Sequence, residues 1–145
     1  METARQLLRG KGHQVWSVSP DDTVYHALEL MAEKNIGAVL VTEGDDIVGI
    51  MSERDYARKV ILKGKFSKDT PVREIMTERV LFVTPDHTVR ECLALMTQRR
   101  FRHLPVMDQG KLAGLISIGD VVKALIADQE FTIEQLENYI TGRRA

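Results

Sequence analysis

The sequence contains a single cysteine, Cys92, among its 145 residues. A disulfide within one chain is therefore excluded. Cys92 falls on the apolar face of a predicted helix, where a buried thiol without redox chemistry is the favoured interpretation and a redox role is the weaker alternative. His13, His26 and His87 are scattered without the spacing of metal ligands, so we expect no metal site.

Long apolar runs are also missing. The longest, Ile36 to Val41, is far shorter than the roughly 20 residues that cross a bilayer, and residues 1–10 lack the apolar core of a signal peptide. The formal net charge is −1, which gives no overall attraction to nucleic acid or to an anionic membrane. We therefore expect a cytoplasmic protein with no nucleic-acid or membrane partner, in which any anion site is local.

An internal repeat is the most informative feature that is present. Residues 18–58 align without a gap on residues 83–123, with twelve identities at an offset of 65 positions. This is the pattern of two copies of one supersecondary unit. A unit of this size is marginal alone, whereas the whole chain can support one good core, so we expect the two copies to pack face to face.

Each copy predicts the order helix, strand, strand, helix. Apolar residues recur at helical spacing after the capping residues Thr23 and Thr88, and short apolar runs then flank a polar turn. A serine begins the last helix of each copy. The class is α/β, with small sheets flanked by helices and related by a pseudo-twofold axis. The elements are expected at 24–31, 38–42, 47–51 and 53–62, and at 89–96, 103–107, 112–116 and 118–127.

Shorter segments complete the predicted organisation. Thr70 and Pro71 begin a short helix through Met76, and residues 5–8 look equivalent to residues 73–76. A separate C-terminal helix is expected from Thr132, which forms a capping box with Gln135. Its apolar stripe would cover the protein's own surface or a second subunit; the stripe comprises Ile133, Leu136, Tyr139 and Ile140. The predicted divisions are 1–62, a linker at 63–69, 70–127 and an extension at 128–145.

A Ser-x-x-Asp pattern closes both copies, as Ser52 to Asp55 and Ser117 to Asp120. A capping box explains this pattern in many helices that bind no ligand. The alternative is an anion site, because a helix start offers backbone N–H groups to phosphate. A carboxylate repels phosphate but accepts hydrogen bonds from both ribose hydroxyls. Phosphate at the serine and sugar at the aspartate together indicate a nucleotide.

The chain resembles the stand-alone bacterial proteins built from a tandem pair of CBS domains, regulatory modules named after cystathionine beta-synthase. The resemblance covers about residues 4–127. The matching segments are Val18–Pro20, Ile36–Val41 and Gly49–Asp55 in the first copy, and Val83–Pro85, Arg102–Val106 and Gly114–Asp120 in the second.

The resemblance implies two clefts between paired repeats that accept adenosyl compounds. Asp55 and Asp120 would hold ribose, and Ser52 and Ser117 phosphate. Backbone at 36–38 and 102–104 would border the base, and the residue pairs 18–19 and 83–84 would close the other side. The candidate nucleotide-binding residues are Val18, Ser19, Ile36, Gly37, Ala38, Ser52, Arg54, Asp55, Val83, Thr84, Arg102, His103, Leu104, Ser117 and Asp120.

The two copies differ in charge near these sites. Arg102 and His103 stand where the first copy has Gly37 and Ala38, so phosphate should be better neutralised in the second copy. Arg54 is a further candidate for phosphate in the first. Residues 99–100 are also basic, but a solvated helix end explains them equally well. We expect unequal sites.

The leading hypothesis is a non-catalytic regulatory module for signal transduction that binds AMP, NAD(H) or ATP, forms a homodimer and is read by an unidentified protein. One alternative is a small nucleotide-processing enzyme with His103 as general base, which turnover of a nucleotide would reveal. Another is a protein-interaction or assembly module with vestigial clefts that acts through its tail helix, which truncation after Ala127 would test.

Overall fold

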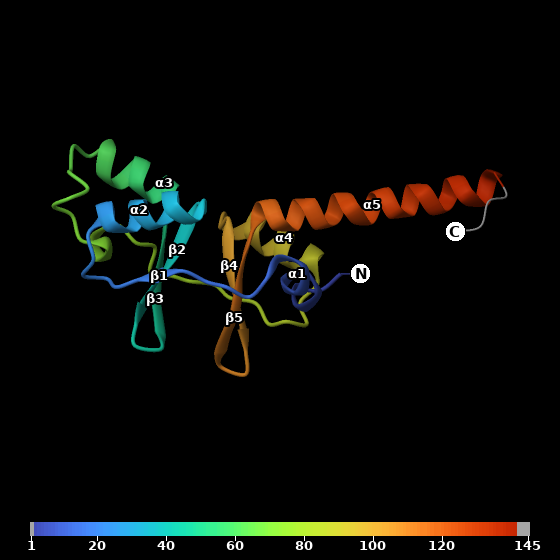
Figure 1. The fold of residues 1–145 in the computed structure, drawn as a ribbon, viewed down its shortest axis with the longest axis horizontal. Helices are drawn as coiled ribbons and strands as arrows, with labels where there is room; N and C mark the ends of the chain where they lie inside the picture. The colour runs from blue at the N-terminus through green and yellow to red at the C-terminus, as the bar shows by residue number, and fades with distance from the viewer. Residues whose placement is uncertain (1, 142–145) are drawn as a thin grey trace. The chain divides into compact units, whose positions relative to one another are not determined.

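The computed structural model describes residues 2–141, except the side chains of Tyr139 and Thr141. The chain forms two compact units (Figure 1). The first-repeat unit comprises residues 15–80. The second-repeat unit comprises the residues up to Gln14 together with those from Leu81 onward. Each unit has a hydrophobic core cluster of its own, whereas the sequence predicts one shared core.

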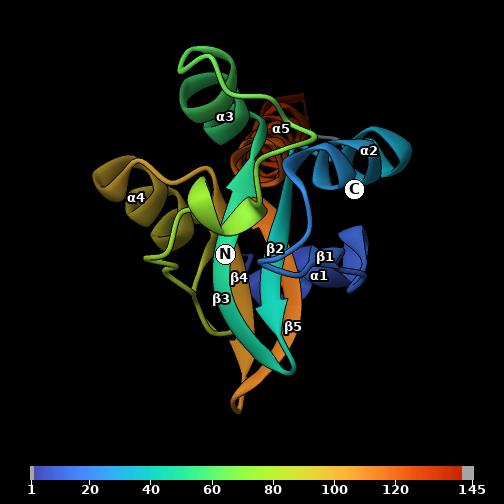
Figure 2. The ribbon, with the colours of Figure 1, turned by 90° about the vertical axis from the view of Figure 1, so that its left-hand side faces the viewer.

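The first-repeat unit contains a three-stranded sheet in the order β1-β2-β3 (Figure 2). β1 pairs with β2 in parallel, and β2 pairs with β3 antiparallel with a bulge at residues 41–42. The predicted strands and first helix are confirmed, but the helix after Ser52 soon becomes a π-helix. The elements are β1 (Ser17–Val18), α2 (Val24–Lys34), β2 (Ala38–Glu43), β3 (Asp46–Ser52), α3 (Glu53–Tyr56), the π-helix Ala57–Ile61 and a 3₁₀ helix, Val72–Glu74.

The second-repeat unit contains the antiparallel pair β4-β5, with the same bulge at residues 106–107. Val83 forms a parallel bridge to Val106 in the position that β1 occupies in the other unit. The predicted strands and first helix are again confirmed. The elements are α1 (Ala4–Lys11), α4 (Val89–Arg99), β4 (His103–Asp108), β5 (Lys111–Ser117) and α5 (Ile118–Thr141).

Helices α2 and α4 form as the sequence predicts. The hydroxyls of Thr23 and Thr88 accept hydrogen bonds from backbone N–H groups three residues later, at 3.1 Å in each case. Both helices end at a residue in the left-handed conformation, Asn35 and Arg100. Their buried faces carry every third or fourth residue into the core, at positions 24, 27 and 31 and at 89, 92 and 96.

The N-terminal segment packs in the second-repeat unit, whereas the predicted division placed it with the first copy. The backbone N–H groups of Ala4 and Arg5 donate to carbonyls of His87 and Pro85, at 2.8 and 3.0 Å. Residues 72–73 make the equivalent bonds to residues 22 and 20 in the first-repeat unit, at 2.8 and 2.9 Å. The predicted equivalence of residues 5–8 and 73–76 is thus confirmed. Each segment completes the unit built from the other sequence copy.

Gly49 and Gly114 occupy the position where these segments cross the sheets. A Cβ on Gly114 would lie 2.6 Å from Cδ2 of Leu8, and a Cβ on Gly49 would lie 2.8 Å from Sδ of Met76. Leu8 and Met76 are themselves equivalent residues of the two docked segments. The glycine shared by both copies therefore permits a close approach that any side chain would block.

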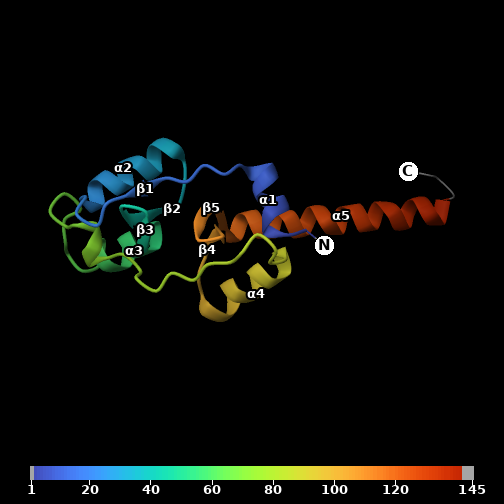
Figure 3. The same cartoon turned by 90° about the horizontal axis from the view of Figure 1, so that it is seen from below.

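The C-terminal extension is a continuation of α5, so the predicted separate helix from Thr132 is wrong. The Thr132 hydroxyl donates to the backbone carbonyl of Asp128 at 3.1 Å, one turn back, and does not cap a helix start. Residues 121–141 contain no glycine or proline, so no helix-breaking residue separates the predicted helix at 118–127 from the residues after Thr132. Figures 1 and 3 show α5 extending past α1 and α4 of its own unit.

Candidate functional site

The Ser-x-x-Asp pattern forms a capping box in the first-repeat unit. Oδ2 of Asp55 accepts from the backbone N–H and the hydroxyl of Ser52, at 3.0 and 3.1 Å, and Ser52 Oγ accepts from the Asp55 N–H. Oδ1 of Asp55 accepts from the Thr77 hydroxyl at 3.3 Å and pairs with Lys59 Nζ at 3.1 Å. Only 12% of the Asp55 side chain is exposed, and both of its carboxylate oxygens interact with residues of its own unit.

The second-repeat unit has the same box with a more open carboxylate. Oδ2 of Asp120 accepts from the Ser117 N–H at 2.8 Å, and the Asp120 N–H donates to Ser117 Oγ at 3.1 Å. Its charge partner is Lys11, at the end of α1, whose Nζ lies 2.6 Å from Oδ2. The same Nζ donates to the carbonyl of Leu115 at 2.6 Å. The Asp120 side chain is 25% exposed, twice as much as that of Asp55.

The strand starts lie beside these boxes, as the sequence predicts. The Gly37 carbonyl accepts from the Glu53 N–H at 3.1 Å, and the Arg102 carbonyl accepts from the Ile118 N–H at 2.8 Å. In the strand register, Ala38 is opposite Ser52 and His103 is opposite Ser117. Residues 36–38 and 102–104 are therefore adjacent to the serine of their own unit. Leu104 is fully buried, so only its backbone is available to a ligand.

The remaining predicted residues lie further from the aspartates or carry no contact to them. Val18 and Val83 are buried one strand away, opposite Val41 and Val106. Ser19 and Thr84 are exposed, and each N–H donates locally, to Asp22 and to His87. Arg54 is exposed on α3. These residues border the site region without being joined to the Ser-x-x-Asp boxes by hydrogen bonds between described residues.

Positive charge is concentrated beside Asp120. Burial lowers the pKa of His103, the nearby charges of Lys11 and Arg102 lower it further, and Asp120 opposes them. In the first-repeat unit, Lys34 lies 4.3 Å from the centre of the Trp16 ring and pairs with Glu33, and Lys59 pairs with Asp55. Each aspartate thus has one lysine as a charge partner, and Arg102 and His103 are the basic residues found near the second box alone among the aligned strand starts.

The carboxyl of Asp120 is held in its ionised form. Burial would raise its pKa, but the hydrogen bonds from Lys11 and from the Ser117 backbone, with the charge of Lys11, lower it below its ordinary value. An ionised carboxylate accepts hydrogen bonds only. Asp120 is therefore suited to a ligand that presents hydroxyl donors.

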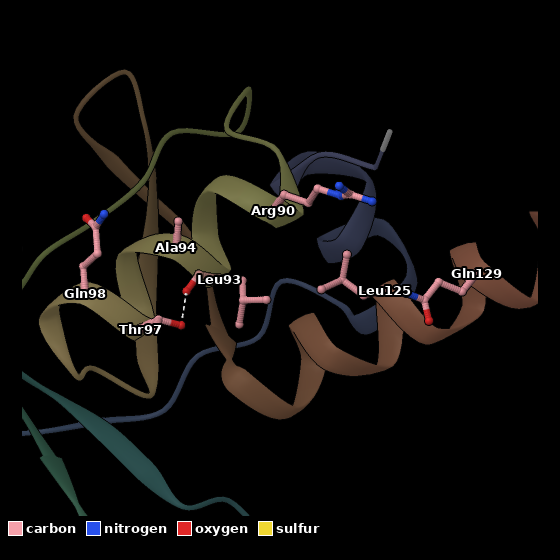
Figure 4. A pocket seen from close by; sticks show the side chains of 7 residues that line it. All are labelled: Arg90, Leu93, Ala94, Thr97, Gln98, Leu125 and Gln129. Atoms are coloured by element: carbon pink, nitrogen blue, oxygen red, sulfur yellow. Dashed lines mark hydrogen bonds between the residues drawn. The ribbon is translucent and has the colours of Figure 1, made fainter.

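Two other features lie apart from these boxes. Cys92 is buried in the core, and this burial raises the pKa of its thiol to about 11, so the thiol stays protonated at neutral pH. A groove of about 630 Å³ lies between α4 and α5, and Figure 4 shows its lining side chains. None of them belongs to the predicted site: the lining residues are Arg90, Leu93, Ala94, Thr97, Gln98, Leu125 and Gln129.

Comparison with known proteins decides the family. The family model described as "CBS domain" matches residues 12–62 and again residues 72–127. The chain belongs to the CBS domain family. It is 41% identical over 150 residues to the CBS domain-containing protein CBSX3, mitochondrial, of Arabidopsis thaliana, and the match covers 97% of this chain and 72% of that protein.

Solved CBS structures share the fold. A CBS-domain protein from Burkholderia ambifaria MC40-6 is 57% identical, with a TM-score of 0.84 over 88% of this chain and 96% of that one. A hexameric CBS-CP12 protein from bloom-forming cyanobacteria is 31% identical, with a TM-score of 0.74 over 83% of this chain and 70% of that one. The mixed α/β fold with two small sheets is thus that of tandem CBS proteins.

Sequence reasoning missed the residues that pair with the two CBS aspartates. Lys59 is four residues after Asp55 on the same helical stretch, and this spacing was a usable signal. Lys11 and Thr77 gave no such signal, because they reach Asp120 and Asp55 only through the docking of separate segments. The lysine beside each aspartate therefore comes from a different element in the two CBS repeats.

Two further features are absent from the described residues. They contain no group of three or more His, Cys, Asp or Glu side chains placed to hold a metal ion. Within residues 2–141, no helix combines the length and apolar character needed to cross a membrane.

Proposed function

We propose that this CBS protein is a non-catalytic regulatory module that binds an adenine nucleotide, AMP, NAD(H) or ATP, at its Ser-x-x-Asp boxes. The observation that carries the proposal is the ionised, partly exposed carboxylate of Asp120 beside the cations Lys11 and Arg102 and the imidazole of His103. A ribose presents hydroxyl donors to such a carboxylate, and phosphate suits the adjacent cations. Nucleotides combine both groups.

The second-repeat unit supplies the stronger of the two sites in this proposal. Asp120 holds ribose, and Ser117 with the neighbouring cations holds phosphate. The backbone at 102–104 borders the base. Asp55 has the same role in the first-repeat unit, but all its bonds to Ser52, Thr77 and Lys59 compete with a ligand. We therefore expect the first-repeat site to bind more weakly.

Occupancy then changes the conformation that an unidentified partner protein reads. We further propose a homodimer as the working form, since a CBS-CP12 relative is described as hexameric and self-association occurs among such proteins. A cytoplasmic location stays a prediction, because the relative CBSX3 is described as mitochondrial. Signalling through occupancy requires no chemical step, so AMP incubated with the protein should be recovered unchanged.

Calorimetric titration of AMP and NADH tests the proposal. Asp120→Asn keeps an oxygen for the capping bonds but removes the charge, and we expect it to weaken binding roughly tenfold to one hundredfold, the equivalent of one charge-assisted hydrogen bond. Asp55→Asn is the matched control and should weaken the main binding event much less. Absence of binding to the unaltered protein, or equal affinity of all three proteins, would contradict the assignment.

A further inference from the structure

The outer part of α5 presents an apolar stripe that its own unit leaves uncovered. Every side chain from residue 126 to residue 137 is exposed. Ile126, Ile133, Leu136 and Ile140 expose 51%, 55%, 58% and 80% of their surface. Large apolar side chains gathered on one helix are typical of a contact surface. A helix of this length standing alone in water is also marginal without packing along its face.

The spacing of the stripe identifies the kind of surface. Counting from Val122, the stripe continues four, seven, eleven, fourteen and eighteen residues later, which is the alternation of four and three that defines a heptad seam. A period of 3.5 residues keeps such a seam facing a second helix when the two wind around each other. We define the α5 seam by these residues: Val122, Ile126, Gln129, Ile133, Leu136 and Ile140.

We infer that the α5 seam pairs with the α5 seam of a second copy of this chain, as a parallel, in-register, two-stranded coiled coil. Isoleucine occupies every a position of the seam, at 126, 133 and 140, and Leu136 and Val122 occupy d positions. β-Branched residues at a with leucine at d favour two parallel strands. The inference deepens the proposed homodimer by naming its surface, and does not depend on nucleotide binding.

Gln129 fixes the register and the direction of this pair. It occupies the remaining d position, where a parallel in-register pair places it opposite Gln129 of the second copy. Two amides can donate to and accept from each other. An antiparallel pair opposes d with a, so the amide would lie against isoleucine without a partner, which is costly. A single polar residue in an otherwise apolar seam is a known device for specifying register.

The flanking positions are compatible with the parallel pair. Glu130 and Glu137 stand at e positions, which face the g positions of the second helix, Leu125 and Thr132. Leu125 and Thr132 carry no charge, so the glutamates meet no like charge across the seam. Phe131, 61% exposed, lies at an f position outside the seam and stays exposed in the pair. It therefore offers a matched apolar control.

Disulfide trapping tests the inference in the full chain. Leu136→Cys places a thiol at a d position, where the two copies approach each other, whereas Glu134→Cys places it at an exposed b position on the other side of the helix. Native Cys92 is buried and does not compete. On mild oxidation we expect Leu136→Cys to form a disulfide-linked dimer and Glu134→Cys to stay monomeric in nonreducing gels.

A second comparison ties the trapped dimer to the seam. Adding Ile133→Ser and Ile140→Ser to Leu136→Cys should abolish the crosslink, whereas adding Phe131→Ser should preserve it. Equal crosslinking of Leu136→Cys and Glu134→Cys would overturn the inference, as would a crosslink that survives the loss of both isoleucines. Crosslinking of mixed Val122→Cys and Ile140→Cys chains in place of Leu136→Cys would show an antiparallel pair and also overturn it.

Discussion

At the scale of single residues, each of the two aspartates caps a helix, and we propose that each also binds a ligand. The capping interpretation of Ser-x-x-Asp is confirmed in both units, because each serine and aspartate exchange the predicted hydrogen bonds. Capping uses one carboxylate oxygen and the serine N–H, and in Asp120 it leaves a quarter of the side chain open. A cap and a ligand site are therefore compatible in the same pair of residues.

The pairing of Lys11 with Asp120 predicts a change in acid stability. The folded-state pKa of Asp120 lies below its ordinary value of 3.8, so its stabilisation is present above that value and is lost as pH falls through the folded-state pKa. Lys11→Gln should lower the free energy of unfolding by about 0.5–1 kcal/mol at pH 6, a modest amount because the pair is partly exposed. The difference should shrink as pH falls below 3.8, through the folded-state pKa of Asp120.

Urea unfolding at a series of pH values measures this effect. Lys111→Gln is the control, since Lys111 is exposed at the start of β5. Parallel stability curves for Lys11→Gln and the unaltered protein over the whole range would show that the pair contributes nothing.

His103 predicts a pH dependence of nucleotide binding. Its lowered pKa favours the neutral ring in the free protein, and a phosphate beside it would favour the protonated ring. Binding would then be accompanied by proton uptake, so AMP affinity should rise from pH 8 to pH 6 more steeply than in His103→Gln. Calorimetry of both proteins separates this effect from the titration of AMP itself, which they share. Identical slopes would place the phosphate away from His103.

At the scale of elements, the sequence predicts that the two docked segments, residues 5–8 and 73–76, are equivalent, but it does not predict the unit in which each one packs. Residues 5–8 and 73–76 share an arginine, a polar residue and then two apolar residues, and the arginines pair with equivalent aspartates, Asp86 and Asp21. The sequence could not show which unit each segment completes. Both segments offer the same groups, so the choice depends on chain path and packing.

The docked segment predicts a coupling between Gly114 and Leu8. Gly114→Ala should destabilise the protein by about 1–3 kcal/mol, because the new methyl group clashes with buried Leu8. Leu8→Ala alone should cost about 2–5 kcal/mol, and the double variant should cost clearly less than the sum, because the clash is removed. Chemical denaturation of the four proteins measures the cycle.

Gly119→Ala is the control for the glycine change, since its Cβ would meet Ser117 Oγ only at an ordinary 3.6 Å. Simple additivity in the Gly114 and Leu8 cycle would contradict the close approach of these residues.

The boundaries of α5 and of the helix after Ser52 show where local patterns mislead. Thr132 and Gln135 fit a capping box, which predicts a helix start at this point. Because residues 121–141 contain no glycine or proline, α5 continues through Thr132 without a break. The π-helix at Ala57–Ile61 likewise could not be predicted, because the spacing of apolar residues there does not distinguish it from an α-helix. Strands and first helices were predictable because their apolar positions alternate with clear turns and caps.

At the scale of the whole molecule, the repeat determined most of what could be predicted. It gave the family, the fold class and the candidate strand starts and Ser-x-x-Asp boxes that the structure brings together within each unit. It did not give the lysines beside the aspartates, because Lys11 and Asp120 are 109 residues apart in the chain. Contacts of that range depend on tertiary packing.

At this scale we also predict that the nucleotide sites bind AMP independently of the C-terminal part of α5. Truncation after Ala127 removes the outer part of α5, in which residues 128–137 are all exposed, and none of the site residues. We expect unchanged AMP affinity by calorimetry together with weaker self-association by sedimentation. Loss of AMP binding in the truncated protein would mean that the sites need the tail, which the proposed function does not include.

A crystal structure of the protein soaked with AMP tests the central claim most directly. The account predicts that both ribose hydroxyls lie within hydrogen-bonding distance of the Asp120 carboxylate, with the phosphate beside Ser117 and the neighbouring cations. AMP bound with its ribose away from both Asp120 and Asp55 would contradict it.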